Sequence, residues 1–391
     1  MSDAALLSLR VRRSPLATIG PAMRVGGQVM HYVKNGATLN YYRLGTREAW
    51  LLAQLDGSRD WAAIGAAYGE RFGAPLSAAG MRQCMQLFGS RGLLEDPSGT
   101  APAQVAPALP RLTVKGWGEV YLRLADPDRA VQWLAARLAV VDGRVAAWCI
   151  ALLIGACELY ALVNHAALGA TLAATIRAPS WQLIVAYCAI VYGGAVLHEL
   201  AHGTMCARYG GRVHDMGLMF RYLMFFPYCK LDDLVVLPHA RARAVTLLAG
   251  VTVNLLMLVP FVAVHRLAPA GSLASQLSAF VLVFYNLSVL VNLLPVLRFD
   301  GYLLVSVGRG RPELKEEAAV ALRGAFQGRT GDWPLLAYGA GYALVTAAAV
   351  TGALYRWVSW TVAKDMLWAA FVPPLLLTAL YVRYGRKKGA A

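Results

Sequence analysis

Six apolar runs, each close to the length that crosses a lipid bilayer, constrain this chain more than any other feature. They cover about residues 145–163, 181–203, 244–264, 276–297, 334–355 and 365–382. An α-helix needs roughly 20 apolar residues to span the hydrocarbon core, where every backbone hydrogen bond must be made internally. The composition agrees, since 58% of the 391 residues are hydrophobic and only 15% are charged. The sequence therefore predicts a mostly α membrane protein with about six transmembrane helices.

The connecting segments predict how these helices are oriented. Lys and Arg concentrate in cytoplasmic loops. They are dense between the second and third runs, between the fourth and fifth, and in the tail: Arg208, Arg212, Arg221, Lys230, Arg241, Arg243; Arg298, Arg309, Arg311, Lys315, Arg323, Arg329; Arg383, Arg386, Lys387 and Lys388. The opposite connections hold only Arg177, Arg266, Arg356 and Lys364. We expect a multi-pass protein of a bacterial-type inner (plasma) membrane, with both termini cytoplasmic. The excess of Lys and Arg that gives the net charge of +15 is then explained by the orientation of the helices in the membrane. No nucleic-acid partner is expected.

The second run contains the pattern HELAH, from His198 to His202. Residues i and i+4 lie on one face of an α-helix, so the two imidazoles can reach a single metal ion. Glu199 lies about 100° further round the helix and points beside that ion rather than at it. This is the place for a general base, and HExxH on a helix is a zinc-protease pattern. The alternative is a pair of histidines that reach from a helix end to the membrane surface.

Catalytic zinc usually takes three protein ligands and a water, so a third ligand is needed at the same membrane depth. The candidate lies in NLLPVLRFDG, from Asn292 to Gly301. The second and fourth runs cross the membrane in the same direction, which brings Asp300 to the level of the two histidines. Pro295 interrupts the helix inside apolar sequence, and such irregular backbone is tolerated only around a buried or water-lined cavity.

Three other residues compete for this role. His214 and Asp215 follow the second run, and Glu158 lies within the first. A lone carboxylate inside a membrane segment is by default a functional hypothesis, because burying its charge in lipid is costly. Glu158 is therefore a rival ligand or, alternatively, part of a water path.

HELAH, followed in a later span by Asn-x-x-Pro and Asp-Gly, resembles the site-2-protease family of intramembrane zinc metalloproteases. The resemblance covers roughly residues 180–305. It implies that His198, His202 and Asp300 bind one zinc ion, that Glu199 is the catalytic base, and that Asn292 helps to hold the substrate backbone. The usual Leu-Asp-Gly of the family reads Phe-Asp-Gly here, which leaves the aspartate in place.

The segment between the two motifs is apolar but is broken by Gly, Pro and charged residues: GGRVHDMGLMFRYLMFFPYCKLDD. It resembles the membrane-associated β-hairpin of this family, which would offer an edge strand to an extended substrate. The alternative is an interfacial loop packed against the helices. PYC and the later RFDGY are most similar to bacterial peptide zinc metalloproteases found with peptide-export systems.

Residues 25–98, after a tail of residues 1–24, are predicted to form a small separate domain. Asn35-Gly36 lies between alternating apolar runs, which is a strong hairpin signal. Three helices are expected to follow, over 46–55, 58–72 and 77–93, capped by Thr46, Ser58 and Ser77. Two strands and three short helices indicate a small α+β winged-helix-like fold.

This region also resembles the PqqD-like domains that recognise leader peptides in ribosomal peptide biosynthesis, through LLAQLDGSRDWAAIGAAYGERFG and LFGSRGLL. That resemblance implies peptide binding by strand addition. A winged helix could instead bind DNA, but the arginines of this region are scattered along it rather than gathered on one helix. A purely structural role is a further alternative.

Residues 99–143 are predicted to be a linker followed by an interfacial amphipathic helix. The proline-bearing stretch that marks the linker begins in the last residues of the preceding domain and covers 97–118, and the amphipathic stretch covers 127–141. Residues 144–305 then form the protease core, and 306–391 the C-terminal spans and basic tail. We expect a zinc metalloendopeptidase that cleaves a peptide or membrane-anchored precursor in the bilayer, as in bacteriocin maturation, with a peptide exporter as a candidate partner. The alternatives are cleavage of an anti-sigma factor or signal-peptide remnant, and a zinc-containing peptide-binding or export-accessory protein without proteolytic activity.

Overall fold

The computed structural model describes residues 3–95, 109–115, 119–140, 143–221, 224–329 and 332–363. The chain forms two compact units, Met1–Glu313 and Leu314–Ala391. Each is described by itself. The first unit contains both sheets and all the candidate site residues.

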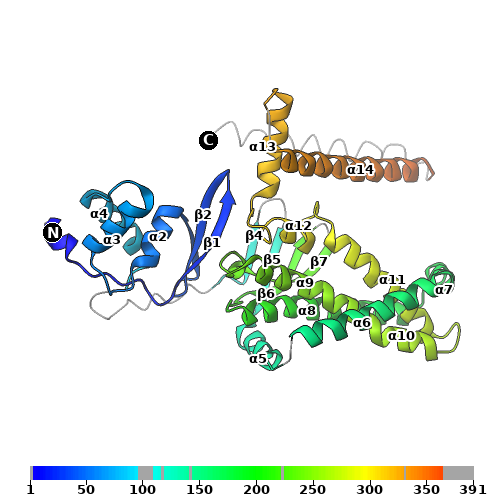
Figure 1. The fold of residues 1–391 in the computed structure, drawn as a ribbon. Coiled ribbons are helices and arrows are strands. Elements are labelled where there is room, and N and C mark those ends of the chain that lie inside the picture. The colour runs from blue at the N-terminus through cyan, green and yellow to red at the C-terminus, as the bar shows by residue number, and fades with distance from the viewer. Residues whose placement is uncertain are drawn as a thin grey trace. The chain divides into compact units, whose positions relative to one another are not determined.

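The first unit begins with a three-stranded antiparallel sheet and a group of helices (Figure 1). The elements are α1 (Asp3–Leu7), β1 (Ala17–Val25), β2 (Gln28–Asn35), β3 (Asn40–Gly45), α2 (Thr46–Gln54), α3 (Trp61–Phe72) and α4 (Ala78–Ser90). The predicted hairpin is confirmed, because β2 pairs with β3 and Asn35 lies opposite Asn40. The sequence analysis missed β1, which pairs with the other edge of β2.

Two of the three predicted helix caps are wrong. The cap of α2 is Gly45 rather than Thr46, which is the first residue of the helix. The cap of α3 is Asp60, whose carboxylate accepts from the backbone N–H of Ala63. Ser58 instead bonds to Asp56 two residues earlier, an alternative that short polar side chains offer at turns. The third cap, on α4, lies at the predicted serine.

Buried side chains of the sheet and the helices form one core in this N-terminal part. Trp61 and Phe88 are its largest fully buried members, and Val33 of β2 joins them. Met23 of β1 instead packs into a different cluster, with residues of the helices that follow. In Figure 1 the strands lie between α2–α4 and the rest of the unit.

Within the described residues, five helical segments are long and apolar enough to cross a membrane. They are α6 (Gly143–Val163), α8 (Trp181–Arg208), α9 (Ala240–Leu256) continued by α10 (Leu258–Leu267), α11 (Leu273–Leu293) and, in the second unit, α14 (Trp333–Ala363). They match five of the six predicted runs. The sixth, 365–382, and the basic tail lie outside the described residues. The chain is thus a mostly α membrane protein.

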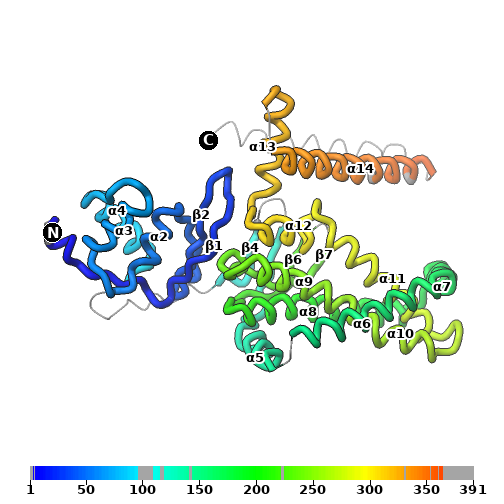
Figure 2. The backbone as a smooth tube through the Cα atoms, in the orientation of Figure 1, coloured from blue at the N-terminus to red at the C-terminus, as the bar shows by residue number. Residues whose placement is uncertain are grey.

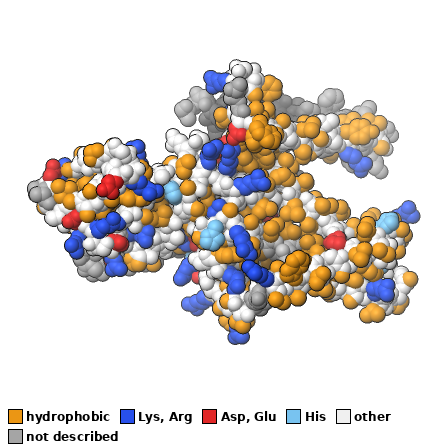
Figure 3. Space-filling view, viewed as in Figure 1, with side chains coloured by type: hydrophobic (Ala, Val, Ile, Leu, Met, Phe, Trp, Pro, Cys, Tyr) orange, Lys and Arg blue, Asp and Glu red, His pale blue; other side chains and the backbone are white. Residues whose placement is uncertain are grey.

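The surface of these helices agrees with a lipid environment. On α6, Trp148, Leu152 and Leu162 are each about 70% exposed, which would be costly in water. Figure 3 shows mostly hydrophobic side chains over α6, α7 (His165–Arg177) and α10. The sequence analysis took 165–177 for a plain connection, but the segment continues as a helix.

A second antiparallel sheet packs against α8 through β7 (Met224–Cys229). Its antiparallel order is β4 (Leu112–Lys115), β5 (Glu119–Ala125), β6 (Met216–Arg221) and β7. The β6–β7 pair is a hairpin, as the sequence predicted, and not an interfacial loop. The predicted linker over 97–118 is wrong for residues 112–115, where alternating apolar residues pair with β5. Residues 96–108 and 116–118 lie outside the described residues.

The remaining elements connect these parts. They are α5 (Asp128–Leu138), the short 3-10 helix η1 (Asp232–Val235), α12 (Asp300–Val305) and, in the second unit, α13 (Leu314–Phe326). The helix α5 falls within the predicted amphipathic stretch 127–141 and buries Val131 and Ala135. It packs on α8, and α8 runs beside α9 (Figure 2). This α8–α9 pair holds the candidate site.

Candidate metal centre

The two motif histidines lie on one face of α8, in the half of the helix that precedes its end at Arg208. The Nε2 atoms of His198 and His202 are 3.0 Å apart. Their side chains are 11% and 3% exposed. The spacing of four residues therefore converges two imidazole nitrogens on one buried point, as the helical period requires.

Asp300 is the first residue of α12, just after the irregular backbone that follows α11. Its Oδ2 atom lies 3.1 Å from His198 Nε2 and 3.2 Å from His202 Nε2. Next to it, Gly301 packs so tightly that a Cβ there would be 2.2 Å from the carbonyl oxygen of Leu293. This close return of the chain onto the end of α11 places the carboxylate at the two imidazoles.

The three side chains meet the geometric requirement for a metal site. Their ligand atoms all lie within 4.8 Å of one another. Two imidazoles and one carboxylate match the three-ligand sets of catalytic zinc, which leave a position open for water. The set thus fits zinc by the chemistry of its donors.

Hydrogen bonds orient two of the three ligands. His202 donates from Nδ1 to the carbonyl oxygen of Thr246 at 2.7 Å, which directs the lone pair of its Nε2 toward the cluster. Asn292, on α11, donates to Asp300 Oδ2 at 2.6 Å and accepts from the Asp300 N–H at 3.3 Å. In this structure the Asn292 amide holds the candidate ligand Asp300, and its expected role in holding the substrate backbone stays a prediction. His198 Nδ1 is buried without a hydrogen-bond partner among the described residues.

The facing helix α9 leaves room for the cluster at Gly250. A Cβ at this position would lie 2.5 Å from His198 Cε1 and Nε2 and from His202 Nε2. Real Cβ atoms essentially never show contacts under 3.0 Å. Gly250 is thus one wall of the site.

Glu199 is adjacent to the histidines but is not part of the ligand cluster. Its Oε2 accepts a hydrogen bond of 2.8 Å from the backbone N–H of Cys229, at the end of β7. One carboxylate oxygen is therefore fixed by the outer strand of the sheet. This hydrogen bond links the helix that carries HELAH to the predicted β-hairpin.

The structure does not bring the rival ligands to the cluster. His214 Nδ1 lies 3.3 Å from Asp126, and Asp215 accepts from the Tyr228 hydroxyl at 2.6 Å. Burial, followed by the neighbouring Asp215, raises the pKa of Tyr228, so the phenol stays protonated and donates. Glu158, on α6, has one buried oxygen with no hydrogen-bond partner among the described residues.

Sequence reasoning missed two contributors to the site, Thr246 and Gly250. Both lie on α9. Thr246 acts through its backbone carbonyl oxygen, and Gly250 acts because it has no side chain. A glycine inside an apolar helical run weakens the helix relative to alanine. This unfavourable glycine was the one feature of the sequence that could have indicated a close packing contact at α9.

Replacing Asp300 by Asn should lower the affinity for zinc by about tenfold or more, because a neutral amide is a poorer ligand than a carboxylate. Metal content of the purified protein after dialysis measures the effect. Asp215→Asn is the matched control and should keep its zinc. Loss of zinc from the control alone would move the third ligand to Asp215.

No protein-family model, curated protein or solved structure matches this chain. The functional conclusion therefore depends on the chemistry and geometry of the site.

Proposed function

We propose that this chain is an intramembrane zinc metalloendopeptidase. The observation that carries the proposal is the convergence of His198, His202 and Asp300 beside Glu199, on helices long and apolar enough to cross a bilayer. Ionisable side chains in such segments are costly and mark functional sites. A zinc ligand set with an acid–base residue next to it is a hydrolytic arrangement.

The roles of the side chains follow from their positions. Zinc, when bound by the three ligands, supplies Lewis-acid chemistry that polarises a peptide carbonyl and makes water more acidic. Glu199 takes a proton from the attacking water at a carboxylate oxygen and delivers it to the leaving amine nitrogen. The bond from the Cys229 N–H keeps this carboxylate beside the cluster. His202 stays oriented through Thr246.

The outer strand β7 supplies the surface for an extended substrate. It is the last strand of the sheet, and α8 bonds to its backbone at two points, through the Tyr192 hydroxyl to the Phe225 carbonyl and through Glu199 to the Cys229 N–H. Pro227 lies between them and has no N–H, as is tolerated in edge strands. An extended peptide lying along β7 would pass the catalytic carboxylate, and to pair with the backbone of β7 it would take the places of Tyr192 and Glu199.

The N-terminal sheet with α2–α4 is proposed to be a winged-helix-like, PqqD-like domain that recognises the precursor. It has the strand order β1-β2-β3 and three following helices. Substrates are peptides or membrane-anchored precursors, and bacteriocin-like products are the favoured class. The site is proposed to face the cytoplasmic side of a bacterial-type inner membrane, with six spans in all.

Labelling of single cysteines tests this orientation. Ala178→Cys and Ala270→Cys, both exposed and within three residues of the start of a candidate spanning helix, should react with an impermeant thiol reagent applied outside cells. Ala240→Cys, exposed at the start of α9, should not react until the membrane is opened. The unsubstituted chain gives the background. If Ala240→Cys were labelled from outside intact cells, the site could not face the cytoplasm as proposed.

The experiment that tests the proposed activity is processing of a co-expressed candidate precursor, followed by mass spectrometry. The parent chain should release products with a new amino terminus at one bond. The Glu199→Gln variant should leave the precursor intact.

A further inference from the structure

The N-terminal domain is fixed to the membrane core through one buried carboxylate, Asp233. Lys34 Nζ lies 2.7 Å from Asp233 Oδ2, and both side chains are under 10% exposed. The Tyr41 hydroxyl and the Arg212 N–H also donate to this carboxylate. Burial and the nearby Asp233 raise the pKa of Tyr41, so it remains a donor at neutral pH.

Further contacts hold the same interface. Arg24 N donates to the Gly310 carbonyl at 2.7 Å, and Arg43 pairs with Glu313 at 2.8 Å. A Cβ at Gly20 would lie 2.7 Å from the Val235 carbonyl oxygen. The N-terminal sheet therefore packs directly on the segments that follow β7 and α12.

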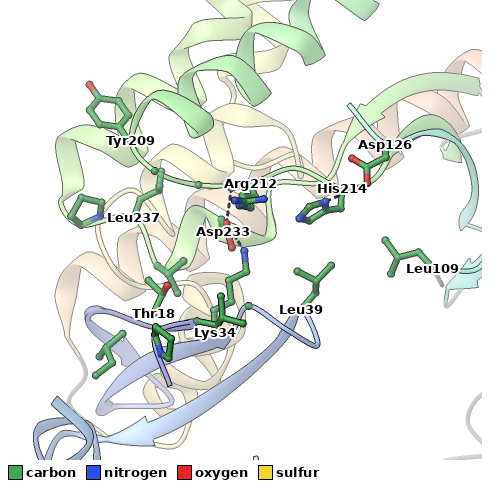
Figure 4. Close-up of a pocket in the computed structure, with 18 of the residues that line it drawn as sticks. Thr18, Lys34, Leu39, Leu109, Asp126, Tyr209, Arg212, His214, Asp233 and Leu237 are labelled. Carbon is green, nitrogen blue, oxygen red and sulfur yellow. Dashed lines mark hydrogen bonds and ion pairs between the residues drawn. The ribbon is translucent and has the colours of Figure 1, made fainter. Parts of the chain in front are cut away.

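Beside Asp233 the interface opens into a cavity of about 730 Å³ (Figure 4). This volume is within the range of ligand pockets, about 300–1,000 Å³. The N-terminal domain lines it with apolar side chains, among them Leu16, Ile19 and Leu39. The core lines it with polar and charged side chains, namely Arg123, Arg212, His214, Asp126 and Asp233.

One basic side chain of the cavity, Arg212, has donors that a ligand can reach. It is 63% exposed, and the carboxylate it pairs with is Asp128, at 3.4 Å. Arg123 is already engaged, because it lies 3.8 Å from Asp126 and its terminal nitrogen donates to the His214 carbonyl at 2.9 Å. Lys34 is already neutralised by Asp233. Arg212 can therefore accept a further carboxylate, which guanidinium groups bind well.

Leu39 presents an apolar side chain to the cavity from a constrained backbone position. It lies in the turn between β2 and β3 with a φ of 58°, and it is the one residue other than Gly with positive φ in the described part of the chain. This conformation is strained for Leu, and such strain is concentrated at functional sites and ligand clamps. The side chain that it places at the cavity is apolar.

We propose that this cavity binds an acidic segment of the peptide substrate, with a carboxylate on Arg212 and an apolar side chain against Leu39. This assignment rests on the proposed function. The wall that carries Arg123 is β5, in the same sheet as β7. A segment bound here is held by both the recognition domain and the sheet whose last strand, β7, is hydrogen-bonded to Glu199.

Binding of short fluorescent peptides to the full-length Glu199→Gln protein tests the proposal without any cleavage. One peptide carries Leu and Glu in a Gly/Ser background, and the other has Gln in place of each Glu. The Glu peptide should bind about tenfold or more tightly than the Gln peptide, and Arg212→Gln should remove that difference. Arg208→Gln, an exposed arginine of α8 that does not line the cavity, is the matched control and should bind as the parent does.

Leu39→Asn separates ligand binding from folding. Asn tolerates positive φ, so the variant should be at least as thermally stable as the parent. It should nevertheless bind the Glu peptide several-fold less tightly, because it loses apolar contact area. Equal affinity for the two peptides, or parent-like binding by Arg212→Gln, would overturn the proposal and leave the hydrolase assignment untouched. Conversely, selective binding would stand even if the parent chain proved not to cleave.

Discussion

Gly250→Ala is expected to leave a folded chain that cannot hold zinc. The added Cβ would lie 2.5 Å from ring atoms of both His198 and His202. Either the imidazoles rotate away or α9 moves back from α8, and both separate the ligands from Asp300. Because metal sites require ligands within a few tenths of an ångström, we expect the affinity for zinc to fall by about a hundredfold or more.

The substitution is informative because it changes no ligand and no charge. Alanine is a better helix former than glycine, so propensity alone would stabilise α9, while overpacking costs about 1–3 kcal/mol. Gly193→Ala, on α8, is the matched control, since a Cβ there meets nothing within 4 Å.

Metal analysis of both purified variants, with circular dichroism as a check on folding, measures the outcome. The control should retain zinc and process precursor as the parent does. If Gly250→Ala folds and keeps a full equivalent of zinc, then the site does not lie between α8 and α9 as described.

The parts of the fold that sequence predicted are those set by local periodicity. Apolar length alone located α6, α8 and α11, because a spanning helix satisfies its own backbone. The HELAH spacing likewise fixed the relation of His198 to His202, since four residues make about one helical turn. The loop charges then brought Asp300 to the same depth, and the structure places its carboxylate at both imidazoles.

The parts that sequence missed depend on contacts between distant segments. No local pattern shows that Lys34 meets Asp233, or that β5 pairs with β6, since these partners are far apart in the chain. Gly250 acts by absent volume, which is visible only when the facing helix is known. Sequence reasoning can name ligands by chemistry, but it cannot name the residues that make room for them.

Glu199→Gln is the second large effect expected. Gln has nearly the volume of Glu and can still accept the hydrogen bond from the Cys229 N–H. It cannot take a proton from water and pass it to the leaving amine. Cleavage should therefore fall on the order of a hundredfold or more, while zinc and peptide binding persist.

Two comparisons make this result specific. His198→Ala should lose both zinc and cleavage, because it removes a ligand of the cluster. Glu158→Gln, on α6, changes another carboxylate of a candidate spanning helix that the structure does not bring to the cluster, and it should cleave at the parent rate. A Glu199→Gln protein that lost its zinc would make Glu199 a ligand rather than a base.

The most direct test of the central claim is the rate at which zinc-loaded Glu199→Gln protein processes a precursor that the parent chain cleaves, followed by mass spectrometry. The account predicts zinc at the parent level with cleavage lower on the order of a hundredfold or more. Processing by the variant at the parent rate would contradict the hydrolase assignment and would favour a zinc-containing peptide-binding protein.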